Sequence, residues 1–135
     1  MIPNDYILQW KGYAPWQTLS MVEHDLIISR ALVELYNNET VNNSLAFRGG
    51  TALNKLYIQP PARYSEDIDM VQLQSAPIGY VIDAIRDSLD SWLGKPQRKQ
   101  TERSVKLVYR YQHLIKNLRS LRLRLIPQNI SRSIT

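Results

Sequence analysis

Two segments in the last third of the chain alternate strictly between apolar residues and other residues. In VKLVYRY (105–111) the alternate positions from Val105 are aliphatic or aromatic, and SLRLRLI (120–126) repeats the pattern with leucine. This period of two is that of a β-strand with one buried face. The residues QHLIKN between the segments suit a turn, so we expect an antiparallel pair of strands. Such a pair requires a covering layer for its apolar face, and this requirement restricts the fold more than any other feature.

The other segments indicate what covers that face. Apolar residues recur at three- and four-residue spacing from Ile78 to Trp92, which predicts an amphipathic helix that stops at Gly94. A longer helix is predicted after Pro15 and ends at an Asn pair. SLAFRGG fits a buried strand, TALNKLY a short helix and DIDMVQL another strand. This order predicts a single α/β domain over 1–135, of the α+β mixed-sheet kind, with helices packed on a small mixed sheet.

The charges of the chain are segregated. Up to Gly94 there are 6 Lys and Arg residues against 11 Asp and Glu, whereas from Lys95 onward 11 basic residues face Glu102 alone. A basic half of this kind commonly contacts phosphate in RNA, DNA or nucleotides, although a solvated face of surface strands would look the same. No segment is apolar over the roughly 20 residues that cross a bilayer, so we expect a soluble cytoplasmic protein.

Asp67 and Asp69 flank one isoleucine at the start of a predicted strand. The period of two places both carboxylates on one face, where they repel each other unless a cation lies between them. Cysteine is absent, so a metal would be a hard cation, and Mg²⁺ binds one or two carboxylates together with phosphate oxygens. The alternative is a solvated pair that caps a neighbouring loop. His24 lies between two acids and is predicted to be a surface or partly buried residue rather than a ligand.

A double glycine precedes the short helix of TALNKLY. Backbone N–H groups at Gly49 and Gly50 can approach an anion, and the helix N-terminus adds partial positive charge. Lys55 and Arg63 are candidate phosphate contacts, and Ser65 either contacts the substrate or shapes the loop. The alternative is an ordinary turn flanked by exposed charges. A phosphate cradle beside a divalent cation describes nucleotidyl or phosphoryl transfer.

The two motifs together resemble a known family. FRGGTALNKLY followed by RYSEDIDMV resembles the paired motif of the AbiEii/AbiGii-type nucleotidyltransferase toxins. The resemblance implies a DNA polymerase β-like fold and a toxin of a bacterial toxin–antitoxin or abortive-infection system. It also implies that Gly50 and Thr51 bind phosphate and that Asp67 and Asp69 are the catalytic carboxylates that bind Mg²⁺. The same motif contains Arg63, Ser65 and Glu66.

The chain departs from the family pattern near its C-terminus. The family places a third carboxylate on a later strand, where this chain has Arg124 or Ile126 and then Pro127. The family's C-terminal helical lobe is also absent, so we expect the N-terminal portion of a longer architecture with little or no activity. One interpretation is a frameshift. Codons can be chosen for residues 123–135 so that the shifted frame reads Glu-Ile-Asp-Ser-Ala-Glu-His-Phe-Pro-Val, a peptide that resembles the family's acidic strand. The other is a shortened domain.

The predicted function is nucleotidyl transfer from an NTP to an RNA (including tRNA) or protein acceptor, with Mg²⁺ as cofactor and a cognate antitoxin as partner. The alternative, from a different functional class, is a non-catalytic module whose basic half binds RNA or an acidic antitoxin. Exposed strand edges would also allow a homodimer.

Overall fold

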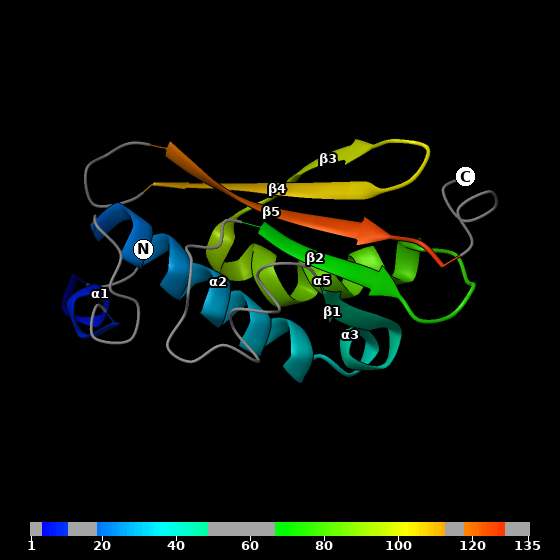
Figure 1. The fold of residues 1–135 in the computed structure, drawn as a ribbon, viewed down its shortest axis with the longest axis horizontal. Coiled ribbons are helices and arrows are strands. Elements are labelled where there is room, and N and C mark those ends of the chain that lie inside the picture. Colours follow the sequence, from blue (N-terminus) through cyan, green and yellow to red (C-terminus); the bar gives the residue numbers. More distant parts are fainter. Residues whose placement is uncertain (1–3, 11–18, 49–66, 113–117, 129–135) are drawn as a thin grey trace.

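The computed structural model describes residues 4–10, 19–48, 67–112 and 118–128 (Figure 1). The predicted helix in TALNKLY lies outside these residues. In chain order the elements are α1 (Asn4–Trp10), α2 (Leu19–Asn37), α3 (Glu39–Ser44), β1 (Leu45–Arg48), β2 (Asp67–Gln72), α5 (Gly79–Leu93), β3 (Gln97–Gln100), β4 (Val105–Gln112) and β5 (Leu118–Ile126). None of the described helices is long and apolar enough to span a membrane.

Five strands form one mixed sheet in the order β1-β2-β5-β4-β3. β4 and β5 are antiparallel, with Leu107 opposite Leu123, as their alternating sequences predict. β2 runs parallel to β5 on its other side and antiparallel to β1. β3 pairs antiparallel with β4 at the far edge. The predicted α/β class with a mixed sheet is confirmed, and β5, the last strand in the chain, lies at the centre of the sheet.

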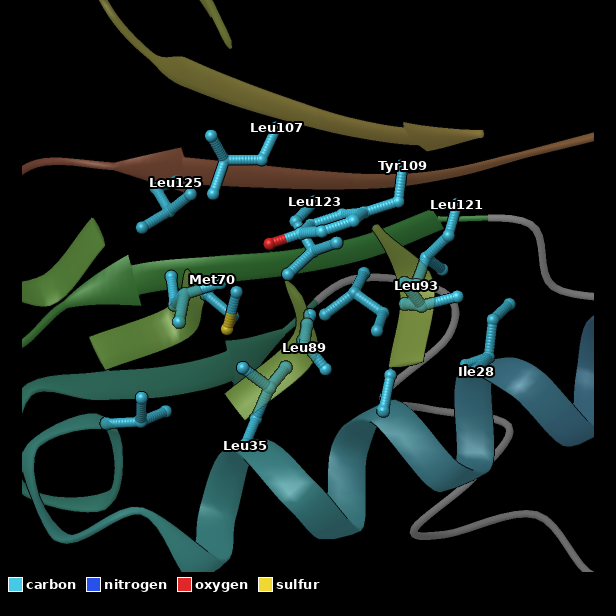
Figure 2. Close-up of a cluster of buried hydrophobic side chains, with 14 of the residues drawn as sticks. Ile28, Leu35, Met70, Leu89, Leu93, Leu107, Tyr109, Leu121, Leu123 and Leu125 are labelled. Atoms are coloured by element: carbon cyan, nitrogen blue, oxygen red, sulfur yellow. The ribbon is translucent and has the colours of Figure 1, made fainter. Parts of the chain in front are cut away.

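The helices lie against one face of this sheet and form the core with it (Figure 1). Ile68 and Met70 of β2, Tyr109 of β4 and Leu123 of β5 come from the inner face of the strands and are fully buried. Figure 2 shows side chains of α2 and α5 packed against these strands, among them Leu35 and Leu89. Because successive side chains of a strand point to opposite faces, the residues between these apolar positions belong to the other face of the sheet.

The ends of the helices follow local signals. The Asn38 side-chain oxygen accepts hydrogen bonds from the backbone N–H groups of Thr40, at 3.0 Å, and Val41, at 3.3 Å. This N-cap starts α3 directly after α2. α5 stops at Gly94, whose φ of 80° favours glycine. The predicted ends of both long helices are therefore confirmed.

One polar group is more buried than its sequence indicated. His24 of α2 is 2% exposed, its Nδ1 hydrogen-bonds with the hydroxyl of Tyr111 on β4, and the two rings stack with centroids 5.8 Å apart. The neighbouring Asp25 accepts a hydrogen bond of 2.8 Å from the indole N–H of Trp10 on α1. His24 thus joins a helix to the sheet instead of lying at the surface, because a histidine with a polar partner can be buried at low cost.

Candidate functional site

β2 presents two carboxylates on the face of the sheet that the described helices leave uncovered. Asp67 and Asp69 are partly exposed, whereas Ile68 and Met70 between and after them are buried. The burial pattern confirms that the two aspartates share one face. Two residues of a strand span about 6.6–6.8 Å, so both carboxylates can reach one small cation.

The neighbouring strand β5 places arginines beside both aspartates. In the parallel register Asp67 lies opposite Arg122, and Asp69 lies opposite Arg124. Arg122 Nε donates a hydrogen bond of 2.8 Å to Asp67 Oδ1. The two side chains remain 50% and 47% exposed, and exposed pairs of this kind contribute only about 0–1 kcal/mol to stability. The contact is therefore easily exchanged for another.

A third arginine approaches from the opposite side. β1 is antiparallel to β2, and its last residue, Arg48, lies opposite Asp69. Side chains at directly opposed positions share a face of the sheet, so Asp69 has an arginine position on each side. The backbone register thus surrounds the two aspartates with three arginines. The sequence alone does not place Arg122 and Arg124 beside the aspartates, because the pairing of β2 with β5 joins segments that are 55 residues apart.

The structure shows where the two candidate positions for the family's third carboxylate lie, and neither holds an acid. Arg124 lies beside Asp69, and Ile126 lies beside Val71, two residues further along both strands. In the described segments, no group of three or more acidic or histidine side chains could hold a metal ion. Among the described residues, Asp67 and Asp69 are the carboxylates that β2 offers to a cation on this face of the sheet. Mg²⁺ commonly takes only one or two carboxylates from the protein, and phosphate oxygens and water complete its coordination. The two aspartates therefore fit this ion.

The predicted phosphate-binding residues lie outside the part of the chain that the structure describes. They are Gly49, Gly50, Thr51, Lys55, Arg63 and Ser65. Their segment, 49–66, is attached at both ends to the site, because it follows Arg48 directly and precedes Asp67 directly. Arg48 and Asp69 are paired in the sheet, so the chain leaves and re-enters the sheet beside the two carboxylates.

The uncovered face of the sheet is strongly basic beyond the two aspartates. The strands β4 and β5 contribute exposed lysines and arginines at positions that alternate with buried apolar residues, and β3 adds Lys99, which lies opposite Lys106. We call this surface the basic face. Its residues are Lys99, Lys106, Arg110, Arg122 and Arg124.

Comparisons with known proteins agree with this fold. Residues 30–132 match the family model described as the nucleotidyl transferase AbiEii toxin of a type IV toxin–antitoxin system. A proposed nucleotidyltransferase from H. pylori is similar in structure, with a TM-score of 0.57 and 18% identity, over 84% of this chain and 48% of that one. JHP933 from Helicobacter pylori has a TM-score of 0.54 and 16% identity, over 82% of this chain and 45% of that one.

Both solved structures share the fold with this protein, which spans about half of their length. No curated protein matches the sequence.

Proposed function

Because this chain belongs to the AbiEii family of nucleotidyl transferase toxins, we propose that it transfers a nucleotide from an NTP to an acceptor hydroxyl and that Asp67 and Asp69 form its metal site. The single observation that carries the proposal is the pair of partly exposed carboxylates on β2 at the point where segment 49–66 joins the sheet. A nucleotidyltransferase needs carboxylates for a metal and backbone N–H groups for phosphate at one place.

The residues of the chain have distinct roles in this mechanism. Asp67 and Asp69 would hold Mg²⁺, and the ion would supply positive charge that offsets the negative charge of the triphosphate. In this proposal Gly49 and Gly50 would offer backbone N–H groups to phosphate oxygens, and Thr51 would add a hydroxyl donor. Lys55, Arg63 and Ser65 would bind the remaining phosphates. The acceptor hydroxyl attacks the α-phosphorus, the bond to the β-phosphate oxygen breaks, and pyrophosphate leaves.

We propose slow turnover for this chain. The third carboxylate of the family pattern would help to deprotonate the attacking hydroxyl, and β5 has Arg124 and Ile126 in the corresponding region. A cation beside the acceptor favours an anionic oxygen but cannot remove the proton. The acceptor must then lose its proton to solvent or to a phosphate oxygen.

The basic face supports RNA as the acceptor. Exposed lysines and arginines of β3, β4 and β5 extend the positive charge away from Asp67 across three strands. A row of cations on one face suits a polyphosphate backbone and places its terminal hydroxyl near the carboxylates. A protein acceptor, and a cognate antitoxin as partner, remain compatible with the family.

A single-turnover assay tests the function even if transfer is slow. Protein in excess is incubated with each α-³²P-labelled NTP, Mg²⁺ and either total bacterial RNA or total bacterial protein. We expect label in the RNA with the unmodified chain and its loss with Asp69→Asn. Asp87→Asn, which alters an exposed aspartate of α5, is the matched control and should label as the unmodified chain does. Equal labelling with Asp69→Asn, or no label in either acceptor, would refute the proposal.

A non-catalytic binding module is the second candidate, because the basic face by itself could bind RNA. In that function Asp67 and Asp69 have no role. RNA binding would then be unchanged in Asp69→Asn, no label would be transferred, and affinity would fall steeply with salt because phosphate contacts release counterions. The labelling assay and a filter-binding titration on the same two proteins separate the candidates.

A further inference from the structure

The proposed metal ligand Asp67 is already engaged by a cation of the protein itself. Arg122 Nε lies 2.8 Å from Asp67 Oδ1. Mg²⁺ needs carboxylate lone pairs at about 2.0–2.1 Å, and the guanidinium occupies the same region of the carboxylate. A metal that binds Asp67 through Oδ1 therefore competes with Arg122 for this oxygen.

The charges around the two carboxylates oppose a free divalent cation. Arg122 and Arg124 lie opposite Asp67 and Asp69 on one side, and Arg48 lies opposite Asp69 on the other. Within the described ranges, three positive charges thus adjoin two negative ones before any ligand arrives. A further dication meets net repulsion there, because like charges at a few ångströms disfavour each other. A triphosphate reverses this balance, since it carries about four negative charges.

We propose that Arg122 is a counter-ion that Mg²⁺ displaces from Asp67, so that the site takes up the metal together with a triphosphate and excludes the free ion. The inference rests on the proposed function of Asp67 and Asp69 and adds an order of binding to it. Arg122 acts here through Asp67, as a positioning residue.

The exposure of the pair makes the exchange feasible. Both side chains are about half exposed, so water solvates the groups as they separate and little free energy is lost. The backbone of Arg122 is fixed by pairing with both β2 and β4. Only the flexible side chain must move, and the guanidinium that it carries then remains close to the incoming phosphates.

The test measures metal affinity and needs no turnover. Mn²⁺ replaces Mg²⁺, and its electron paramagnetic resonance signal reports the unbound ion. Titrations are made with and without each α,β-methylene nucleoside triphosphate, which the transfer reaction cannot cleave. The variants are Arg122→Gln, which removes the counter-ion, and Arg122→Lys, which keeps its charge. The matched control is Arg98→Gln, which removes an exposed arginine of β3, three strands or about 14 Å from β2 in the sheet.

We expect the unmodified chain to bind Mn²⁺ weakly alone and more tightly with one of the analogues. Arg122→Gln should bind free Mn²⁺ about thirtyfold more tightly, the effect of one unit charge about 4 Å from a dication in a water-like dielectric. Arg122→Lys and Arg98→Gln should match the unmodified chain.

Two outcomes would overturn the inference, and they are distinguishable. If the analogue increases Mn²⁺ affinity in the unmodified chain but Arg122→Gln and Arg98→Gln bind the free ion equally, the counter-ion role fails and the proposed function stands. If the unmodified chain and Asp67→Asn bind Mn²⁺ with the analogue equally, the metal site itself fails, and the counter-ion role fails with it.

Discussion

At the scale of single residues, buried polar groups and exposed ion pairs have different roles in this protein. The Tyr109 hydroxyl donates a hydrogen bond of 2.7 Å to Asp90 from a fully buried ring, and burial raises the pKa of Tyr109. The Arg122–Asp67 pair is exposed and contributes little to stability. The Tyr109–Asp90 hydrogen bond therefore joins β4 to α5 in the fold, whereas the exposed Arg122–Asp67 contact can be replaced by contacts with other groups.

Tyr36 gives a prediction for alkaline pH. Burial raises its pKa to about 12, and its hydroxyl donates to the backbone oxygen of Leu45 at 3.3 Å. In the unfolded chain a tyrosine loses its proton near pH 10, so between about pH 10 and 12 the folded state holds more protons and the free energy of unfolding falls as pH rises. Tyr36→Phe should lose less stability than the unmodified chain over this window. Thermal melts from pH 9 to 11.5 measure this.

The matched control for this change is the exposed Tyr80. Tyr80→Phe should follow the unmodified chain at every pH. If Tyr36→Phe and Tyr80→Phe lose stability equally above pH 10, burial does not raise the pKa of Tyr36.

At the scale of elements, the periodic segments could be predicted and the short ones could not. β4, β5 and α5 each bury one face, so apolar residues recur in each with the period of a strand or of a helix. Such a pattern can be recognised within the segment itself. α3 has six residues and β3 four exposed ones, which is too short for a period to show. The parallel pairing of β2 with β5 depends on contacts far apart in sequence. For this reason the shared face of Asp67 and Asp69 could be predicted, and the position of Arg122 beside Asp67 could not.

The junction between α2 and α3 tests how much one cap contributes. Asn38 caps α3, and its amide also donates to the backbone oxygen of Ala84 on α5 at 3.3 Å. Asn38→Ala should lower the free energy of unfolding by about 1 kcal/mol, because two backbone N–H groups lose their acceptor. Urea denaturation measures the change. Asn43→Ala, at an exposed position within α3, is the control. A loss for Asn38→Ala no larger than the control's would show that the cap is dispensable.

At the scale of the whole molecule, the acidic and basic residues that are segregated along the sequence lie largely in two different layers, the helices and the sheet. The sheet exposes the basic face, whereas exposed acids such as Asp83 and Asp87 lie on the helix α5. A polyanion should therefore bind to the sheet side, where Asp67 and Asp69 also lie. The exposed basic residues of β3, β4 and β5 thus share one surface, which composition alone could not show.

Salt dependence tests that orientation. The double variant Lys106→Gln with Arg110→Gln removes two exposed charges of β4 from the basic face. The slope of log affinity for RNA against log salt should become shallower by about 1.4 to 1.8, because each of the two phosphate contacts contributes about 0.7 to 0.9. Arg86→Gln with Lys95→Gln removes two exposed charges elsewhere and should leave the slope unchanged. Equal slopes for both double variants would place RNA on another surface.

The central claim, that Asp67 and Asp69 hold a metal and a nucleotide, is tested most directly by thermal shift. The unmodified chain, Asp67→Asn and the control Asp87→Asn are melted with each NTP, with and without Mg²⁺. A ligand that binds only the folded state raises the melting temperature. The account predicts stabilisation by one NTP with Mg²⁺ in the unmodified chain and the control, and its loss in Asp67→Asn. An equal shift in all three proteins, or no shift with any NTP in the unmodified chain, would contradict it.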